Sequence, residues 1–364
     1  MKNSLDFKIQ FSNLWCMSFV NCLAAVYVYL EGLQGELPKK CDPAADDGRI
    51  CFGCGGCNDP EPQSAYFCLF DTMCGRSALQ LRFDGVPTAM CALIGDGDGA
   101  GGWSGKCGTD YTTDFLFGFI GYEYRKITDA AAFKGEIAAS VDAGRPVIAE
   151  CTADGGAFRV ITGYDGDTLI ADYVLNGQQT NSPPLPAPSY GELKALYVIC
   201  EKTAPRHTLK DGLTRIKRVM ENNVGENIWD AGIAEITKYF ISPTDDEFAQ
   251  IDPEELSSFR NGVAKTITNQ FNSHTFNVAF FNSPRADMRG PEFSIIRDEV
   301  DRLQTRLGGY AHAAGRFNNV NVSAIGPFRA GFGKMLISAV EDIKSAHLGL
   351  LETMNKAIEI LEKG

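Results

Sequence analysis

The clearest pattern of apolar and polar positions runs over residues 144–173, in the sequence GRPVIAECTADGGAFRVITGYDGDTLIADY. Three short runs in it are rich in Val, Ile, Thr and aromatic residues, which predicts strands over 146–150, 157–164 and 168–173. The Asp-Gly-Asp sequence between the last two runs is typical of a tight hairpin turn. This stretch therefore predicts the centre of an antiparallel sheet.

Apolar periodicity predicts further elements on both sides of this stretch. Apolar residues at a spacing of four predict a helix over 129–143, and a long apolar run predicts another over 12–30. Strands are predicted over 115–122 and 193–200. Residues 36–110 show no sustained period and hold most of the cysteines, so we expect an irregular, Cys-rich insertion there.

From residue 208 the pattern changes to helical periodicity throughout. Helices are predicted over 209–222, 228–240, 253–271, 293–307 and 325–361. Residues 202–207 are predicted to form a hinge before them. The expected fold class is therefore α+β, with a sheet-containing domain over 1–203 and an α-helical domain over 204–364.

Length and charge limit the kinds of partner. The chain has 364 residues, enough for two domains with cores of their own. Its net charge is −12 and its isoelectric point is about 4.9, which disfavours nucleic acid and anionic membrane surfaces as partners. The apolar run over 14–30 lacks a clear cleavage motif, so we interpret it as a buried helix. We therefore expect a cytoplasmic protein whose 12 cysteines are reduced.

Cys16 is the first residue with candidate chemistry. It lies at the start of the first predicted helix, where the helix dipole favours the thiolate form. Gln10 lies six residues earlier on an extended segment, from which its amide can donate into an oxyanion hole beside the thiol. The alternative interpretation of these two residues is a buried structural cysteine with no catalytic role.

Together with the hairpin, these residues resemble the papain-like cysteine peptidase superfamily. The Gly-Arg-Pro-Val-Ile strand, the Gly-Tyr-Asp sequence and Asp172 on the return strand are similar to bacteriocin-processing cysteine peptidases and to the butirosin biosynthesis protein H family. The similarity covers about residues 8–32 and 115–200. It implies a papain-like core, an N-terminal helix plus an antiparallel sheet, followed by an α-helical domain. It also implies that Cys16 is the nucleophile, Gln10 the oxyanion donor and Asp172 the residue that orients a histidine.

The expected histidine is missing from this pattern. Strand register places it at Ala157, counting back from Asp172 places it at Gly156, and the sequence has no His before His207. Imidazole normally takes the thiol proton and returns it to the leaving group, so a thiol and a carboxylate alone cannot complete this chemistry. The sheet-containing domain therefore lacks a Cys–His pair of its own.

Three explanations of the missing histidine remain open. The domain binds a ligand without cleaving it, or His312 of the helical domain supplies the imidazole, or another residue acts in its place. Strand alternation puts Arg159 on the same face as Ala157, where a guanidinium could hold Cys16 as a thiolate or pair with Asp172. An arginine cannot shuttle protons, which favours a substrate-binding role for Ala157 and Arg159.

These observations predict a non-catalytic or divergent binding member of the superfamily. One alternative is a Cys-dependent acyltransferase or amide-cleaving enzyme, as the butirosin family implies, acting on a small molecule or on a peptide or acyl substrate. A second alternative is an interaction protein stapled by a metal at Cys51, Cys54 and Cys57, for which Cys41, Cys68 or Cys74 could supply the fourth ligand. We expect no cofactor, and the sequence does not predict the oligomeric state.

Overall fold

The computed structural model describes residues 2–7, 19–33, 62–75, 112–152, 158–171, 187–225, 227–256 and 328–363, with isolated positions at 78, 259 and within 293–302. The chain divides into two compact units. The sheet unit comprises Met1–Cys74, Met90–Leu209 and Asn282–Ala286, and the helical unit comprises Gly75–Ala89, Lys210–Phe281 and Asp287–Gly364. The division of the chain at 203/204 into two domains stays a prediction.

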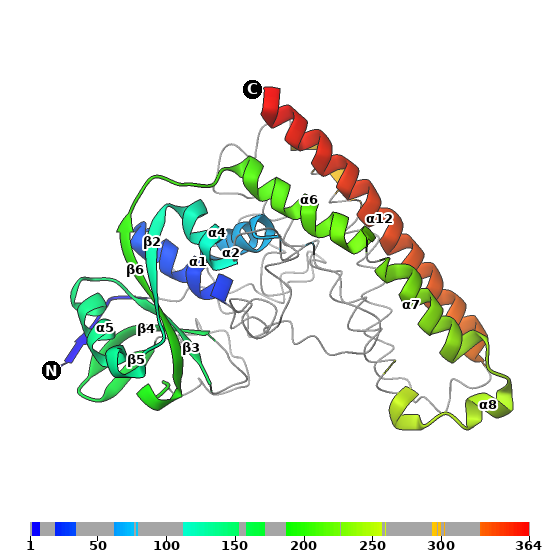
Figure 1. Ribbon diagram of the computed structural model, residues 1–364, viewed down its shortest axis with the longest axis horizontal. Coiled ribbons are helices and arrows are strands. Elements are labelled where there is room, and N and C mark those ends of the chain that lie inside the picture. Colours follow the sequence, from blue (N-terminus) through cyan, green and yellow to red (C-terminus); the bar gives the residue numbers. More distant parts are fainter. Residues whose placement is uncertain are drawn as a thin grey trace, which may run out of the picture. The chain divides into compact units, whose positions relative to one another are not determined.

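The described part of the sheet unit contains an antiparallel sheet (Figure 1). Its strands are β1 (Lys2–Ser4), β2 (Tyr122–Ile127), β3 (Val147–Cys151), β4 (Phe158–Asp165), β5 (Thr168–Ala171) and β6 (Leu193–Lys202). Their order is β1-β4-β3-β6-β2, and β5 pairs with β4. The strands predicted over the central stretch and over 193–200 are confirmed, and Gly166 adopts a positive φ of 61° in the predicted hairpin turn.

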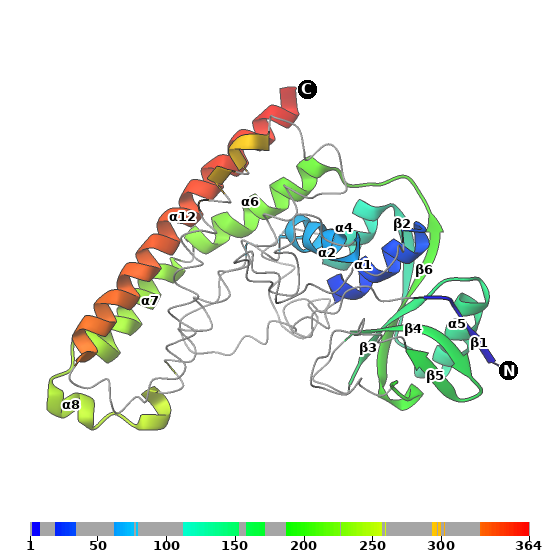
Figure 2. The ribbon, with the colours of Figure 1, turned by 180° about the vertical axis from the view of Figure 1, so that it is seen from behind.

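Helices cover both faces of this sheet (Figures 1 and 2). The predicted helix over 129–143 is confirmed as α5 (Ala130–Asp142), which begins where the Asp129 carboxylate accepts a hydrogen bond from the Ala131 N–H. Phe133 and Ile137 of α5 pack on alternate strand residues such as Val147. The other face packs on α1 (Phe19–Leu30), whose Phe19 contacts Phe158 with ring centroids 5.6 Å apart.

Two parts of the sheet unit correct the sequence predictions. The strand predicted over 115–122 is wrong, because the chain forms α4 (Thr112–Ile120), turns at Gly121 with φ 75°, and only then enters β2. The run is apolar on every side, so its period does not distinguish a buried helix from a buried strand. Residues 36–110 are not wholly irregular either. They include α2 (Pro62–Met73), whose side chains from Phe67 to Phe70 are buried.

The described helical unit is built around one long helix. Its elements are α6 (Leu209–Gly225), α7 (Ile228–Ile236), a π-helical turn η4 (Thr237–Ile241), α8 (Asp245–Ala249) and α12 (Arg329–Lys363). These elements confirm the helices predicted over 209–222, 228–240 and 325–361, whereas most of the other two predicted helices lies outside the described residues. Leu213, Ile216 and Val219, the apolar stripe of α6, are buried.

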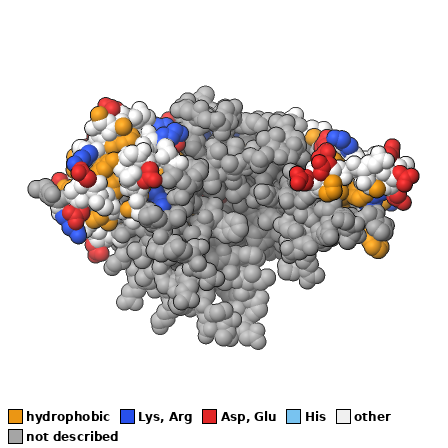
Figure 3. All heavy atoms as spheres, turned by 90° about the horizontal axis from the view of Figure 1, so that it is seen from below, with side chains coloured by type: hydrophobic (Ala, Val, Ile, Leu, Met, Phe, Trp, Pro, Cys, Tyr) orange, Lys and Arg blue, Asp and Glu red, His pale blue; other side chains and the backbone are white. Residues whose placement is uncertain are grey.

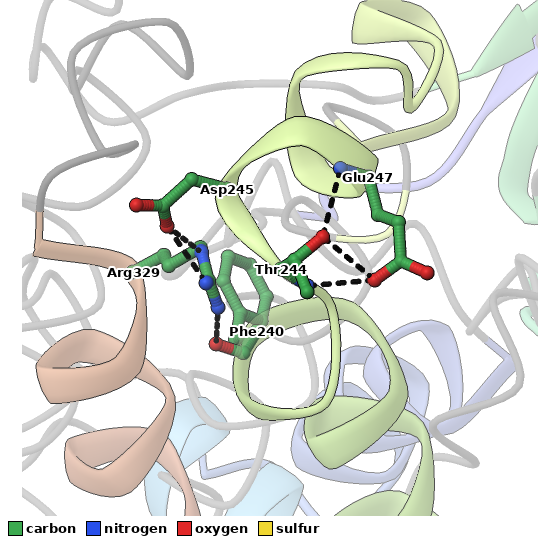
Figure 4. A network of polar contacts seen from close by, with 5 residues as sticks. All are labelled: Phe240, Thr244, Asp245, Glu247 and Arg329. Atoms are coloured by element: carbon green, nitrogen blue, oxygen red, sulfur yellow. Dashed lines mark hydrogen bonds and ion pairs between the residues drawn. The ribbon is translucent and has the colours of Figure 1, made fainter.

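A polar network connects the start of α12 with the start of α8 (Figure 4). Arg329 donates to the Asp245 carboxylate at 2.8 and 3.2 Å and to the carbonyl oxygen of Phe240 in the π-helical turn at 3.4 Å. Thr244 caps α8, because its hydroxyl accepts from the Glu247 N–H while its own N–H donates to the Glu247 carboxylate. The first turn of α8 carries three acidic residues, Asp245, Asp246 and Glu247. Figure 3 shows acidic side chains on the described surface.

Two further observations concern membranes and thiols. Among the described helices, none has both the length and the apolar character needed to cross a bilayer. The described cysteines form no disulfide bond with one another; they are Cys22, Cys68, Cys74, Cys151 and Cys200.

Candidate functional site

The structure describes one of the five predicted site residues. Gln10, Cys16, Ala157 and Asp172 lie outside the described residues, so their mutual arrangement stays a prediction. The same holds for His312 and for the three cysteines of the proposed metal site; those cysteines are Cys51, Cys54 and Cys57. The described part of the candidate site is the region around Arg159 in the sheet unit.

Arg159 is a buried residue of β4, the strand on which sequence register placed the missing histidine. It pairs with Ala149 of β3, and 5% of its surface is exposed. Ala149 in turn pairs with Leu196 of β6, so the guanidinium side chain starts from the same face of the sheet as two apolar residues. Burying a cation in such surroundings is unfavourable unless polar groups compensate for it. The position of Arg159 in the sheet is therefore a specific feature of this fold.

Two buried thiols lie near this arginine and were not predicted as site residues. Burial, together with Cys151 at the end of β3, raises the pKa of Cys22 on α1 to about 12, although Arg159 partly opposes both effects. The Cys151 thiol donates to the carbonyl oxygen of Ala149 at 3.9 Å. A thiol with so high a pKa is protonated at neutral pH, and the thiolate is the nucleophilic form. Cys22 is therefore not a nucleophile in this structure.

His207 is the one histidine in the residues that make up the sheet unit. Its ring stacks on Phe115 of α4, with centroids 4.8 Å apart and planes 22° from parallel. The N–H of Arg206 donates to the carbonyl oxygen of Gly118 at 2.7 Å, and the N–H of Thr203 donates to that of Gly121 at 2.8 Å. The segment predicted as a hinge therefore lies along α4 and is bonded to it.

Two glycines, Gly118 and Gly121, lie where this segment contacts α4 and the turn after it. A Cβ atom at Gly118 would lie 2.5 Å from Cδ2 of His207, and one at Gly121 would lie 2.7 Å from the carbonyl oxygen of Thr203. Real Cβ atoms do not approach other atoms so closely, so a side chain at Gly121 would collide with the backbone of Thr203, and one at Gly118 would displace the His207 ring. Two glycines at the end of an apolar run thus marked a site of close approach, which periodicity alone did not reveal.

Three polar side chains of the sheet unit, Glu31, Tyr122 and Lys202, connect the end of α1 with strands β2 and β6. Tyr122 of β2 donates to one Glu31 carboxylate oxygen at 2.7 Å, and Lys202 of β6 donates to both oxygens at 2.7 Å. Burial raises the pKa of Glu31, but the bonds from Lys202 and Tyr122 outweigh it and keep that pKa below its usual value. Burial and the neighbouring Glu31 raise the pKa of Tyr122. An ionised carboxylate therefore connects α1 with two strands.

The described groups favour binding over proton transfer. Arg159 is a buried residue whose charge acts on Cys22, and burial keeps the Cys22 thiol protonated. Neither group can accept and return a proton near neutral pH. Within the described residues, no group of three His, Cys, Asp or Glu side chains is placed to hold a metal ion. Neither Arg159 nor Cys22 therefore provides a general base.

Comparison with known proteins assigns no family to the chain. No protein-family model matches the sequence, and no curated protein or solved structure is significantly similar to it.

Proposed function

We propose that this protein is a binding member of the papain-like cysteine peptidase superfamily that has no catalytic histidine. In this proposal the sheet unit carries the papain-like core, and the helices after residue 204 form a separate α-helical domain. The observation that carries the proposal is the absence of His from residues 1–206, which include both Cys16 and Asp172. Without imidazole, the thiol lacks the group that normally removes its proton.

The placement of Arg159 supports an anionic ligand. A guanidinium presents several N–H donors in a planar fork that matches a carboxylate, and partial burial strengthens such contacts. Arg159 lies one residue into β4, two positions after Ala157, where a small side chain would leave room beside Cys16. The proposed ligand is a small molecule or a peptide or acyl compound that carries a carboxylate.

The stacking of His207 on Phe115 supports the proposal that the protein has no catalytic histidine. Its ring face is covered by a phenyl ring, and the backbone on its N-terminal side is bonded to α4. An imidazole that shuttles protons needs a free nitrogen within hydrogen-bond reach of the thiol. We therefore assign His207 to the packing of the segment against α4, and a His207→Ala variant tests this assignment in the assay below.

A turnover assay tests whether the protein is an enzyme. The native protein and Cys16→Ala are incubated with a mixed fluorogenic peptide set and with an acyl thioester plus an amine acceptor. We expect equal background rates for both proteins, and equal rates for His207→Ala. Turnover by the native protein that Cys16→Ala abolishes would overturn the binding proposal and establish the acyltransferase or amide-cleaving alternative.

Alkylation by iodoacetamide tests the proposed position of the histidine. Ala157→His should place an imidazole near Cys16, lower the pKa of its thiol and raise its alkylation rate at pH 7 by about tenfold. Cys22 is a matched internal control, because its buried thiol has a pKa of about 12 and should remain unlabelled in both proteins. An unchanged rate at Cys16 would show that the assumed strand register is wrong.

A ligand screen tests the role of Arg159. The probes are acetylated tripeptides with either a free or an amidated C-terminus, and the measurement is the thermal unfolding midpoint. We expect stabilisation by some free carboxylates and none by their amides, and we expect Arg159→Met to remove the effect while keeping a stem of similar length. Stabilisation that Arg159→Met leaves intact would place the binding site elsewhere.

A further inference from the structure

We infer that the junction of α6, α7 and α12 in the helical unit is an acid-sensitive switch, in which protonation of His347 separates the three helices. This inference uses residues of the helical unit only and does not depend on the proposed ligand of the sheet unit.

His347 is a buried histidine at the centre of this junction. It lies on α12 with 4% of its surface exposed, and its Nε2 atom is 3.2 Å from the carbonyl oxygen of Met220 on α6. Its ring is 4.8 Å from the ring of Trp229 on α7, centroid to centroid. One imidazole therefore contacts the two other helices at the same time.

The contact with Met220 fixes where the hydrogen of the neutral ring lies. A carbonyl oxygen can only accept a hydrogen bond, so Nε2 carries the hydrogen and donates it. The atom that takes up a proton on acidification is therefore Nδ1. Protonation would add a second N–H group and a full positive charge to the interior of the junction.

The described residues that contact the His347 ring do not compensate for this charge. The Nε1 atom of Trp229 is buried with no hydrogen-bond partner among the described residues, so the ring packed against His347 has an unsatisfied donor. A second donor and a cation beside it would be left in an apolar environment, which is strongly unfavourable. Burial accordingly lowers the pKa of His347 from 6.5 to about 4, although its bond to Met220 partly opposes the shift.

Several charged groups on the three helices are engaged in other contacts. On α12 and α7, Lys344 and Asp230 form an ion pair at 2.8 Å, one helical turn before His347. On α6, Lys217 pairs with Glu221, and the buried Arg215 lies with its side chain beside Gly75.

The direction of the pH dependence follows from these values. Because the pKa of His347 is lower in the folded state, its neutral form contributes stability above pH 6.5, and this contribution is lost as the pH falls towards 4. The folding equilibrium constant of the junction should decrease by about 100-fold between pH 7 and pH 4 through this residue alone. The loss begins below pH 6.5, where isolated carboxylates, with ordinary pKa values near 4, are still largely ionised.

The experiment follows the fluorescence of Trp229 in the full chain. Trp15→Phe and Trp103→Phe leave it as the single tryptophan, and urea unfolding is measured at pH 7 and pH 4. His347→Gln keeps an N–H donor for Met220 but does not titrate. We expect the change in the unfolding constant between the two pH values to be about 100-fold larger in the protein that retains His347 than in the His347→Gln variant. Equal pH dependence in both proteins would overturn the inference.

Two further measurements test whether His347 is the titrating group. His207→Gln is the matched control, because it removes an imidazole from the sheet unit and should leave the Trp229 transition unchanged. If His347→Gln fails to fold, the titration of the native protein is followed by NMR with ¹³C-labelled histidine. A His347 resonance that titrates near pH 4 supports the switch, and one that titrates near 6.5 overturns it.

Discussion

The sheet unit and the helical unit each contain a glycine on which another element packs closely, but the two glycines face different kinds of atoms. A Cβ atom at Gly163 on β4 would lie 2.6 Å from the carbonyl oxygen of Asn3 and 2.8 Å from Cα of Ser4. A Cβ atom at Gly333 on α12 would lie 2.7 Å from Cδ1 of Ile241 and from Cβ of Phe240. The first contact is with backbone, and the second is with side chains.

This difference shows how each unit fixes its elements. β1 is held to β4 by backbone pairing, in which Ser4 lies opposite Gly163, so the strand cannot move away without losing hydrogen bonds. In the helical unit, Ile241 can adopt another rotamer, because side chains adjust at a smaller energetic cost than paired strands. The sheet unit should therefore tolerate added volume at such contacts less well than the helical unit.

The largest expected effect is that of Gly163→Ala. The added methyl group would collide with the backbone of Asn3 and Ser4, so β1 must leave the sheet or β4 must distort. We expect a loss of about 3 kcal/mol in the free energy of unfolding, measured by urea denaturation of the sheet unit. The control is Gly135→Ala on α5, where a Cβ atom meets no other atom within 4 Å. A cost below that of Gly333→Ala would contradict the comparison.

A smaller effect is expected for Gly333→Ala. Cδ1 of Ile241 can rotate away, whereas Cβ of Phe240 is fixed to the backbone, so α12 must shift slightly from the π-helical turn. We expect a loss of about 2 kcal/mol, followed through Trp229 fluorescence. Adding Ile241→Val should recover part of this loss, because it removes the atom that would be 2.7 Å away. Gly331→Ala, which faces open space, is the control.

The parts of the fold that could be predicted from the sequence are those encoded by local patterns. Strands β3, β4 and β5 followed from short apolar runs and a turn sequence, and α5 followed from the spacing of its apolar residues. These are local signals. The helix α4 could not be predicted, because its buried apolar run has no period that separates a helix from a strand.

The candidate site was predictable to a smaller extent. Arg159 was found because strand alternation is a local rule, and the structure places it in the predicted strand. The proximity of Cys22 and Cys151 depends on how α1 packs against the end of β3, which no local pattern encodes. The contact of His207 with Phe115 likewise joins segments far apart in the sequence, and only Gly118 on α4 and Gly121 after it indicated a close approach.

A third prediction concerns the polar group at the end of α1. Glu31→Gln removes the charge that Lys202 and Tyr122 contact, and we expect a loss of about 1 kcal/mol at pH 7. Because the pKa of Glu31 is lower in the folded state than its ordinary 4.5, this contribution should disappear as the pH falls below 4.5. Native protein and variant should therefore become equal in stability in acid. A difference that persists there would assign the effect to packing.

The smallest expected effect is that of Asp167→Asn in the β4–β5 turn. Asp167 forms an ion pair with Lys134 of α5, which lowers the pKa of the carboxylate, just as Glu31 is paired with Lys202. The side chains of Asp167 and Lys134 are 87% and 61% exposed, however, so water already solvates both charges and salt screens their attraction. We expect an unfolding midpoint within the scatter of repeated measurements. A loss of stability as large as that of Glu31→Gln would contradict this expectation. It would show that an ion pair alone stabilises the contact of a helix with this sheet, without the burial and the second donor found at Glu31.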